Sequence, residues 1–75
     1  MPIIITAYDR EGLLRDIGAI TANENINIAE LRVQTRNSIA SIFLTMELEN
    51  LEQLSRVLAK IEMLPNVIEA RRRVV

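Results

Sequence analysis

The residues best suited to bind a ligand are six consecutive ones near the N-terminus: Asp9, Arg10, Glu11, Gly12, Leu13 and Leu14. Gly12 stands where a strand pattern gives way to a helical one, and its missing Cβ lets a ligand approach the backbone. The free N–H groups of a first helical turn favour an anion such as a carboxylate. The same residues also fit a plain tight turn in which Asp9 caps the helix. From spacing alone, the plain turn is favoured.

The residue inventory argues against catalysis. The chain contains no His, no Cys and no Trp. This removes zinc sites of the usual ligand types, histidine general-base chemistry and thiol nucleophiles. An acylphosphatase-like reaction would need an Arg and an Asn to hold phosphate and position water, and no Gly-rich loop surrounds Arg10. We therefore predict no catalytic residue, no metal site and no cofactor.

RNA binding through an open sheet face is a second alternative. The only two aromatic residues, Tyr8 and Phe43, fall on the first and third predicted strands with suitable parity for stacking bases. However, the third strand lacks a basic-Gly-aromatic signature, the net charge is −1, and Glu30, Glu47 and Glu69 would repel phosphate. Cross-strand packing is the simpler role for the two rings. The run of three arginines at 71–73 is similarly interpreted as a solvated strand end, with contact to a polyanion as the minority alternative.

Length and composition indicate one domain spanning residues 1–75. A chain of 75 residues with 49% apolar residues and no cysteine needs a dense core or association with another copy. No apolar run approaches the roughly 18 residues of a membrane span, and the N-terminus has no signal-peptide pattern. We therefore expect no contact with a membrane and a cytoplasmic location.

The hydrophobic periodicity changes four times along the chain, and with the polar turn between the two central strands it predicts six elements. Alternation with period two predicts strands, and spacing of three and four predicts helices. Asn50 is predicted to cap the second helix, with Gln53 completing a capping box, and Pro65 prevents its continuation. The predicted strands are 2–8, 28–36, 40–49 and 67–75, and the predicted helices run from Gly12 to the segment Asn23–Asn25 and from Asn50 to before Pro65.

This order predicts a ferredoxin-like βαββαβ sandwich of the α+β class. Each helix has one apolar stripe, so both should cover the same face of a four-stranded antiparallel sheet with strand order 2-3-1-4. A bulge is expected near Ala29, where the parity of the strand changes. Met46 and Met63 are expected to fill the core. The predicted core comprises Ile5, Leu13, Ile17, Ile20, Leu31, Val33, Ile42, Leu44, Leu54, Leu58 and Ile61.

Three segments of the chain resemble the ACT domain, a small amino-acid-sensing module of metabolic enzymes. They are Asp9-Arg10-x-Gly12-Leu13-Leu14-x-Asp16, the segment 22–28, and Leu64-Pro65-x-Val67-Ile68-x-Ala70-Arg71-Arg72. The closing segment is the more specific one, and it is similar to the C-terminal ACT domain of the RelA/SpoT family of (p)ppGpp synthetases and hydrolases. The resemblance covers about Ile3 to Arg73.

The resemblance implies a non-catalytic regulatory domain of a larger enzyme. The parent would be a GTP pyrophosphokinase of the stringent response, with its catalytic domains upstream of this segment. Met1-Pro2 lies directly before the first strand, so we expect a fragment from the C-terminus of that enzyme. The resemblance also implies contact of the parent with the ribosome. The alternative function is a protein-, ribosome- or RNA-contacting domain with no small-molecule ligand.

ACT domains pair side by side and bind ligands between the first strand–helix loop of one copy and the start of the second strand of the other. The resemblance therefore implies a homodimer, paired through sheet edges or helices, and an amino-acid ligand. In this chemistry, N–H groups of residues 11–14 hold the carboxylate, and Asp9, Asn25 or Asn27 accepts from the ammonium. Leu13, Ile26 and Ile28 would form an apolar subsite for a branched-chain ligand. The implied ligand-binding residues are Asp9, Arg10, Glu11, Gly12, Leu13, Leu14, Asn25, Ile26, Asn27 and Ile28.

Overall fold

Four strands and two helices follow one another in the predicted order. The computed structural model describes residues 1–73, so Val74 and Val75, the end of the predicted last strand, lie outside the described residues. The strands are β1 (Pro2–Tyr8), β2 (Asn27–Arg36), β3 (Ile39–Glu47) and β4 (Val67–Arg72), and the helices are α1 (Leu13–Asn23) and α2 (Leu51–Glu62).

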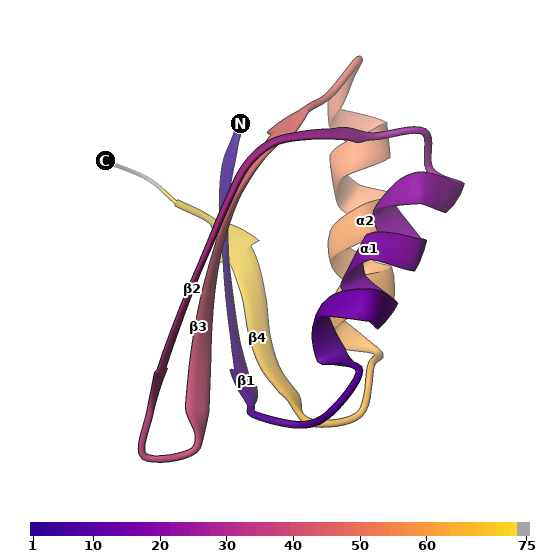
Figure 1. The fold of residues 1–75 in the computed structure, drawn as a ribbon. Helices are drawn as coiled ribbons and strands as arrows, with labels where there is room; N and C mark the ends of the chain where they lie inside the picture. The colour runs from indigo at the N-terminus through magenta and orange to yellow at the C-terminus, as the bar shows by residue number, and fades with distance from the viewer. Residues whose placement is uncertain (74–75) are drawn as a thin grey trace.

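The four strands form one antiparallel sheet in the order β2-β3-β1-β4, and both helices cover the same face of it (Figure 1). This confirms the predicted ferredoxin-like sandwich. Asn37 and Ser38, both with positive φ, make the two-residue turn between β2 and β3. The predicted bulge lies in β2, where the register shifts between Ile28 and Glu30. Within residues 1–73, the opposite face of the sheet is covered by no helix, so its side chains are open to solvent or a partner.

The core lies between the helices and the two central strands. Ile3, Ile5 and Ala7 alternate inward along β1, as the period-two pattern predicts. Ala40, Ile42, Leu44 and Met46 do the same along β3, and the helices complete the core with Leu13, Ile17, Leu54, Val57 and Ile61. Ile20 and Leu58 are only partly buried, but they pack against this cluster.

Three apolar residues predicted to lie in the core, Leu31, Val33 and Met63, are exposed instead, and so is Leu51 at the start of α2. Leu31 and Val33 are 48% and 42% exposed because β2 is an edge strand, and the helices cover the central strands rather than this edge. The prediction that one face of β2 is buried is therefore wrong for this chain alone. Leu51 begins α2 and Met63 follows its last turn, and both side chains point away from the core, at 63% and 83% exposed.

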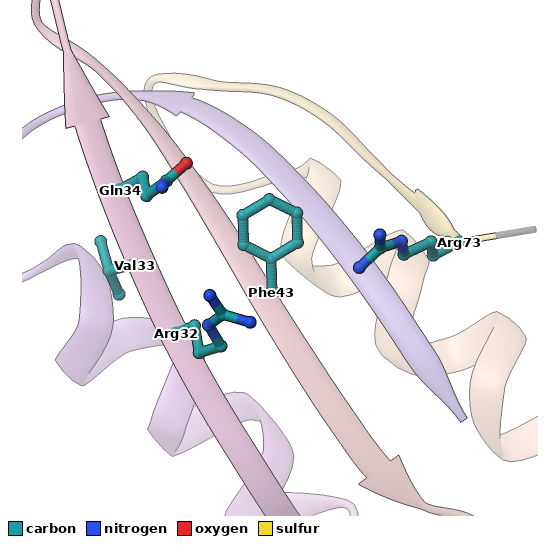
Figure 2. Close-up of a pocket in the computed structure, with 5 residues that line it drawn as sticks. All are labelled: Arg32, Val33, Gln34, Phe43 and Arg73. Carbon is teal, nitrogen blue, oxygen red and sulfur yellow. The ribbon is translucent and has the colours of Figure 1, made fainter. Parts of the chain in front are cut away.

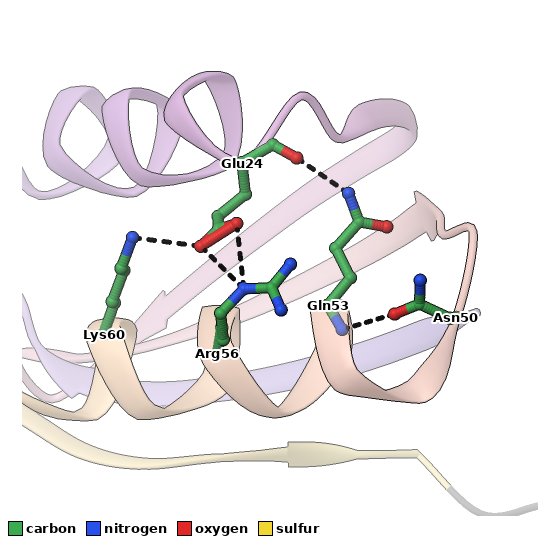
Figure 3. A network of polar contacts seen from close by, with 5 residues as sticks. All are labelled: Glu24, Asn50, Gln53, Arg56 and Lys60. Carbon is green, nitrogen blue, oxygen red and sulfur yellow. Dashed lines mark hydrogen bonds and ion pairs between the residues drawn. The ribbon is translucent and has the colours of Figure 1, made fainter.

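A polar network joins the end of α1 to α2 (Figure 3). Asn50 caps α2 as predicted, because its side chain accepts from the Gln53 N–H at 2.8 Å. The Gln53 side chain does not return to Asn50: it accepts from the Glu49 N–H and donates to the Glu24 carbonyl at 2.7 Å. The Glu24 carboxylate accepts hydrogen bonds from the Lys60 ammonium at 3.0 Å and from the Arg56 guanidinium at 3.3 Å. The hydrogen bond from Lys60 is the main reason that the pKa of Glu24 is lowered.

Among residues 1–73, no helix has the length and apolar character needed to cross a membrane.

Candidate functional site

The loop between β1 and α1 is held by hydrogen bonds to the two neighbouring turns. The Tyr8 N–H donates to the Asn66 carbonyl and the Asp9 N–H to the Ser38 carbonyl, both at 2.8 Å. The loop therefore shares one end of the sheet with the β2–β3 turn and the α2–β4 turn. These contacts set the direction in which the chain enters α1.

Gly12 is the N-cap residue directly before α1 and adopts a left-handed conformation, with φ of 84°. A side chain is strained at this φ, and an added Cβ would lie 3.0 Å from the Arg15 guanidinium. No side chain among the described residues accepts from the first-turn N–H groups, so Asp9 does not cap the helix as the plain-turn alternative proposes. The Leu13 N–H makes only a long bond to the Arg10 carbonyl, at 3.3 Å. The start of α1 therefore presents backbone N–H groups that can donate hydrogen bonds to a bound anion.

Arg10 connects this loop to two other parts of the fold. Its guanidinium donates to the Asp16 carboxylate at 2.8 Å and to the Pro65 carbonyl at 3.1 Å. A weaker bond reaches the Glu11 carbonyl at 3.3 Å. The donors of Arg10 thus have partners within the chain, and its side chain holds the loop against α1 and the α2–β4 turn.

A small pocket of about 210 Å³ opens beside Gly12, between the start of α1 and the helix-covered face of β2 and β3. Five of the six predicted loop residues line it, whereas Glu11 does not. Sequence reasoning missed the lining residues from the sheet, although the register pairs Val33 with Ile42 on this face. The pocket is lined by Asp9, Arg10, Gly12, Leu13, Leu14, Arg15, Val33, Ala40 and Ile42.

The second predicted segment, Asn25 to Ile28, lies at the opposite end of α1. The helix has 11 residues and is therefore about 16 Å long, so one chain does not bring the two segments together. Asn25 adopts φ of 57° as the helix ends, and Ile26 is buried in the core. The Asn27 side chain donates to Glu47 at 2.6 Å. A site that uses both segments needs a second copy of the chain.

Beside the pocket, an apolar surface is left uncovered on the edge of the sheet. Leu31 and Val33 of β2 and Leu14 of α1 are each more than 40% exposed. β2 is ten residues long, and one side of its backbone faces no strand. An edge with exposed apolar side chains is a surface on which another strand can pair.

Comparisons with known proteins agree with this architecture. The profile of the ACT domain family matches residues 1–72. The chain is 47% identical over 70 residues to a GTP pyrophosphokinase of Escherichia coli strain K12, and the match covers 91% of this chain. It is 46% identical over 72 residues to a GTP pyrophosphokinase of Haemophilus influenzae, with 93% covered. The chain spans only 9% and 10% of the length of these relatives.

Solved structures show the same fold. The crystal structure of the ACT domain from a GTP pyrophosphokinase of Chlorobium tepidum superposes with a TM-score of 0.84 at 19% identity, covering 96% of this chain and 94% of that one. A homoserine dehydrogenase from Thiobacillus denitrificans superposes with a TM-score of 0.80 at 25% identity, covering 96% of this chain and 17% of that one. With the βαββαβ sheet and the match over residues 1–72, these likenesses lead to one conclusion: the chain belongs to the ACT domain family.

Proposed function

We propose that this ACT domain senses a free amino acid and thereby regulates a GTP pyrophosphokinase. As an ACT domain the chain is a regulatory module, and the relatives it matches at 46–47% identity are GTP pyrophosphokinases. In such an enzyme the domain would act in the stringent response, on catalytic domains that lie elsewhere in the parent chain. The observation that carries the ligand proposal is the uncapped start of α1 beside a small pocket.

The start of α1 supplies what an amino-acid carboxylate needs. Backbone N–H groups at a helix N-terminus bind anions through hydrogen bonds and the helix dipole. Gly12 has no side chain that would block a ligand from the backbone at the start of α1. On the sheet side, the pocket is lined by the apolar Val33, Ala40 and Ile42. A volume of about 210 Å³ suits a short aliphatic side chain, so we expect valine, leucine or isoleucine to bind better than a charged amino acid.

A second copy completes the site in this proposal. The pocket is smaller than most ligand sites, and within one chain it lacks an amide oxygen from Asn25 or Asn27 for the ammonium group. Pairing of two β2 edges would cover Leu31 and Val33. β2 suits this role better than the other edge, because β4 has six residues and its pairing with β1 is irregular between Thr6 and Ala7. A ligand bound between two copies would favour the paired form by its differential affinity.

An NMR titration of the 75-residue chain with valine, leucine, isoleucine and serine tests the ligand proposal. We expect amide shifts at residues 9–14 and 25–28, largest for the branched-chain amino acids. Val33→Asp places a charge in the pocket wall without opening the core, and should weaken binding at least tenfold. Leu51→Asp is the matched control, because Leu51 is exposed far from the pocket and should leave binding unchanged.

Sedimentation equilibrium at tens of micromolar tests the pairing. We expect a homodimer for the wild type and for Leu51→Asp, and a monomer for Val33→Asp. If millimolar amino acids shift no amide at residues 9–14 or 25–28, the sensing proposal is wrong. The domain is then better described as a contact surface for protein or ribosomal RNA without a small-molecule ligand.

A further inference from the structure

The face of the sheet that no helix covers carries an arginine-flanked aromatic ring at its centre. The strand register places Arg32, Phe43, Ile4 and Arg71 in one row across the four strands. Arg73 lies two residues after Arg71 on the same face, and its backbone N–H donates to the Pro2 carbonyl of β1. This row lies on the opposite face of the sheet from α1, and the hollow around it shares only Val33 of the edge strand with the lining of the candidate amino-acid pocket.

A hollow of about 510 Å³ opens around this ring (Figure 2). Figure 2 shows Arg32 and Arg73 on either side of Phe43, with Gln34 above it on the neighbouring strand. The Arg73 guanidinium carbon lies 5.7 Å from the centre of the Phe43 ring, within the range of a cation–π contact. A second hollow, lined by Gln34, Thr35, Arg36 and Ser41, continues the first along β2, since Gln34 borders both.

Three arginines on this face have no carboxylate partner among residues 1–73, whereas four other arginines of the chain have one. Arg10, Arg15, Arg56 and Arg71 each have a carboxylate within 4.0 Å. Within residues 1–73, Arg32, Arg36 and Arg73 have no such partner. Three guanidinium groups are thus available along β2 and at the end of β4, and a guanidinium fork matches the geometry of a phosphate.

We propose that this hollow binds a single nucleotide unit, with the base stacked on Phe43 and the phosphates held by the arginines. A planar ring between guanidinium groups and beside an amide has the chemistry that recognises a base together with its phosphate. Gln34 supplies both a donor and an acceptor for the edge of the base. The sheet row therefore provides a stacking surface, a polar edge and positive charge within one site.

The spacing of the rings limits the site to one nucleotide. The other aromatic ring on this face, Tyr8, lies four residues along β1 from Ile4, the partner of Phe43, a separation of about 13 Å along the strand. Glu30, Glu47 and Glu69 also lie on this face and would oppose a long polyanion. A nucleotide that is free and one that belongs to a short RNA present the same base and phosphate, and the experiment separates the two.

Titration of the 75-residue chain with ATP and GTP, followed by amide NMR, tests the site. We expect shifts at residues 32–34, 41–43 and 73, and none at residues 9–14. Phe43→Leu, which keeps an apolar side chain, and Arg32→Gln should each weaken binding about tenfold, as loss of a stacked ring or a phosphate contact does. Arg72→Gln is the matched control: it removes the same charge as Arg32→Gln, but Arg72 of β4 alternates to the other face of the sheet and should change affinity less than twofold.

Three comparisons decide the outcome. Inorganic tripolyphosphate and guanosine should each bind at least tenfold more weakly than GTP, because the site requires both base and phosphate. If tripolyphosphate binds as well as GTP, or if Arg72→Gln weakens binding as much as Arg32→Gln, the contact is nonspecific charge attraction and the proposal is overturned. If a six-nucleotide RNA binds while ATP and GTP shift nothing, an extended RNA surface replaces the single-nucleotide site. Amide shifts at residues 9–14 test the amino-acid proposal, and they are distinct from the shifts that test the nucleotide site. The failure of one proposal therefore does not decide the other.

Discussion

The two ends of α1 differ in whether their backbone polar groups have hydrogen-bond partners within the chain. At the C-terminal end, Glu24, Asn25 and Ile26 each donate their N–H within the last turn, and the Glu24 carbonyl accepts from Gln53. At the N-terminal end, Gly12 begins the helix with no side-chain acceptor from residues 1–73. One end is therefore completed by the fold, whereas the other leaves donors beside a pocket. The closed end therefore contributes to stability, and the open end is the one at which we propose that a ligand binds.

Removing the Gln53 side chain tests the closed end and should have the largest effect. Gln53→Ala keeps the helix propensity of α2 but leaves the Glu24 carbonyl and the Glu49 N–H without their partners. Because the Gln53 side chain is buried, we expect a loss of about 2–3 kcal/mol in the free energy of unfolding. Urea denaturation measures it. Gln34→Ala, at an exposed position, is the control, and a loss below about 0.5 kcal/mol for Gln53→Ala, the level of a surface site, would contradict the account.

Replacing Gly12 or Gly18 by alanine should change the free energy of unfolding in opposite directions. Gly12→Ala forces a side chain into the left-handed region and should cost about 1–2 kcal/mol. Gly18→Ala, inside α1 with nothing within 4 Å of its added Cβ, should stabilise the domain by about 0.5–1 kcal/mol. Thermal and urea unfolding of the two variants measure the difference. Equal effects in the two variants would mean that the conformation of Gly12 is not required.

The Glu24 carboxylate gives the closed end a smaller, pH-dependent contribution. Its pKa is lowered in the folded state, so the folded state binds fewer protons than the unfolded state as the pH falls below the ordinary value. The stabilisation is present at neutral pH and is lost as the pH falls through the lowered pKa. We expect Glu24→Gln to destabilise the domain at pH 7 and to have little effect near pH 3.

Urea unfolding at the two pH values measures this dependence. Glu62→Gln is the control on α2, because Glu62 is exposed and has no ion pair within residues 1–73; it should unfold like the wild type at both pH values. A Glu24→Gln effect of the same size at pH 3 and pH 7 would show that the ion pairs with Arg56 and Lys60 are not its source.

Local sequence patterns predicted the elements better than they predicted the surfaces. Alternation identified the inward faces of β1 and β3, and the Asn50 cap is a local signal that the structure confirms. The same alternation in β2 predicted burial of Leu31 and Val33, which are exposed. Periodicity identifies an apolar face but not the element that covers it, and at a sheet edge that element can belong to another copy.

The candidate site was predicted only in part for a similar reason. The loop residues Asp9 to Leu14 are adjacent in sequence, and the glycine at a strand–helix junction marks them. Val33, Ala40 and Ile42 join the pocket through strand register, which depends on where the bulge in β2 falls. The Arg10 contact with the Pro65 carbonyl spans 55 residues, and no local pattern indicates it.

A titration that compares leucine with leucinamide tests the central claim most directly. The two molecules share a side chain and an ammonium group and differ in the carboxylate, which the account places at the open end of α1. We predict saturable shifts of the Gly12, Leu13 and Leu14 amides with leucine, and at least tenfold weaker binding of leucinamide. Equal binding of the two molecules, or shifts confined to residues 25–28, would contradict a carboxylate site at the start of α1.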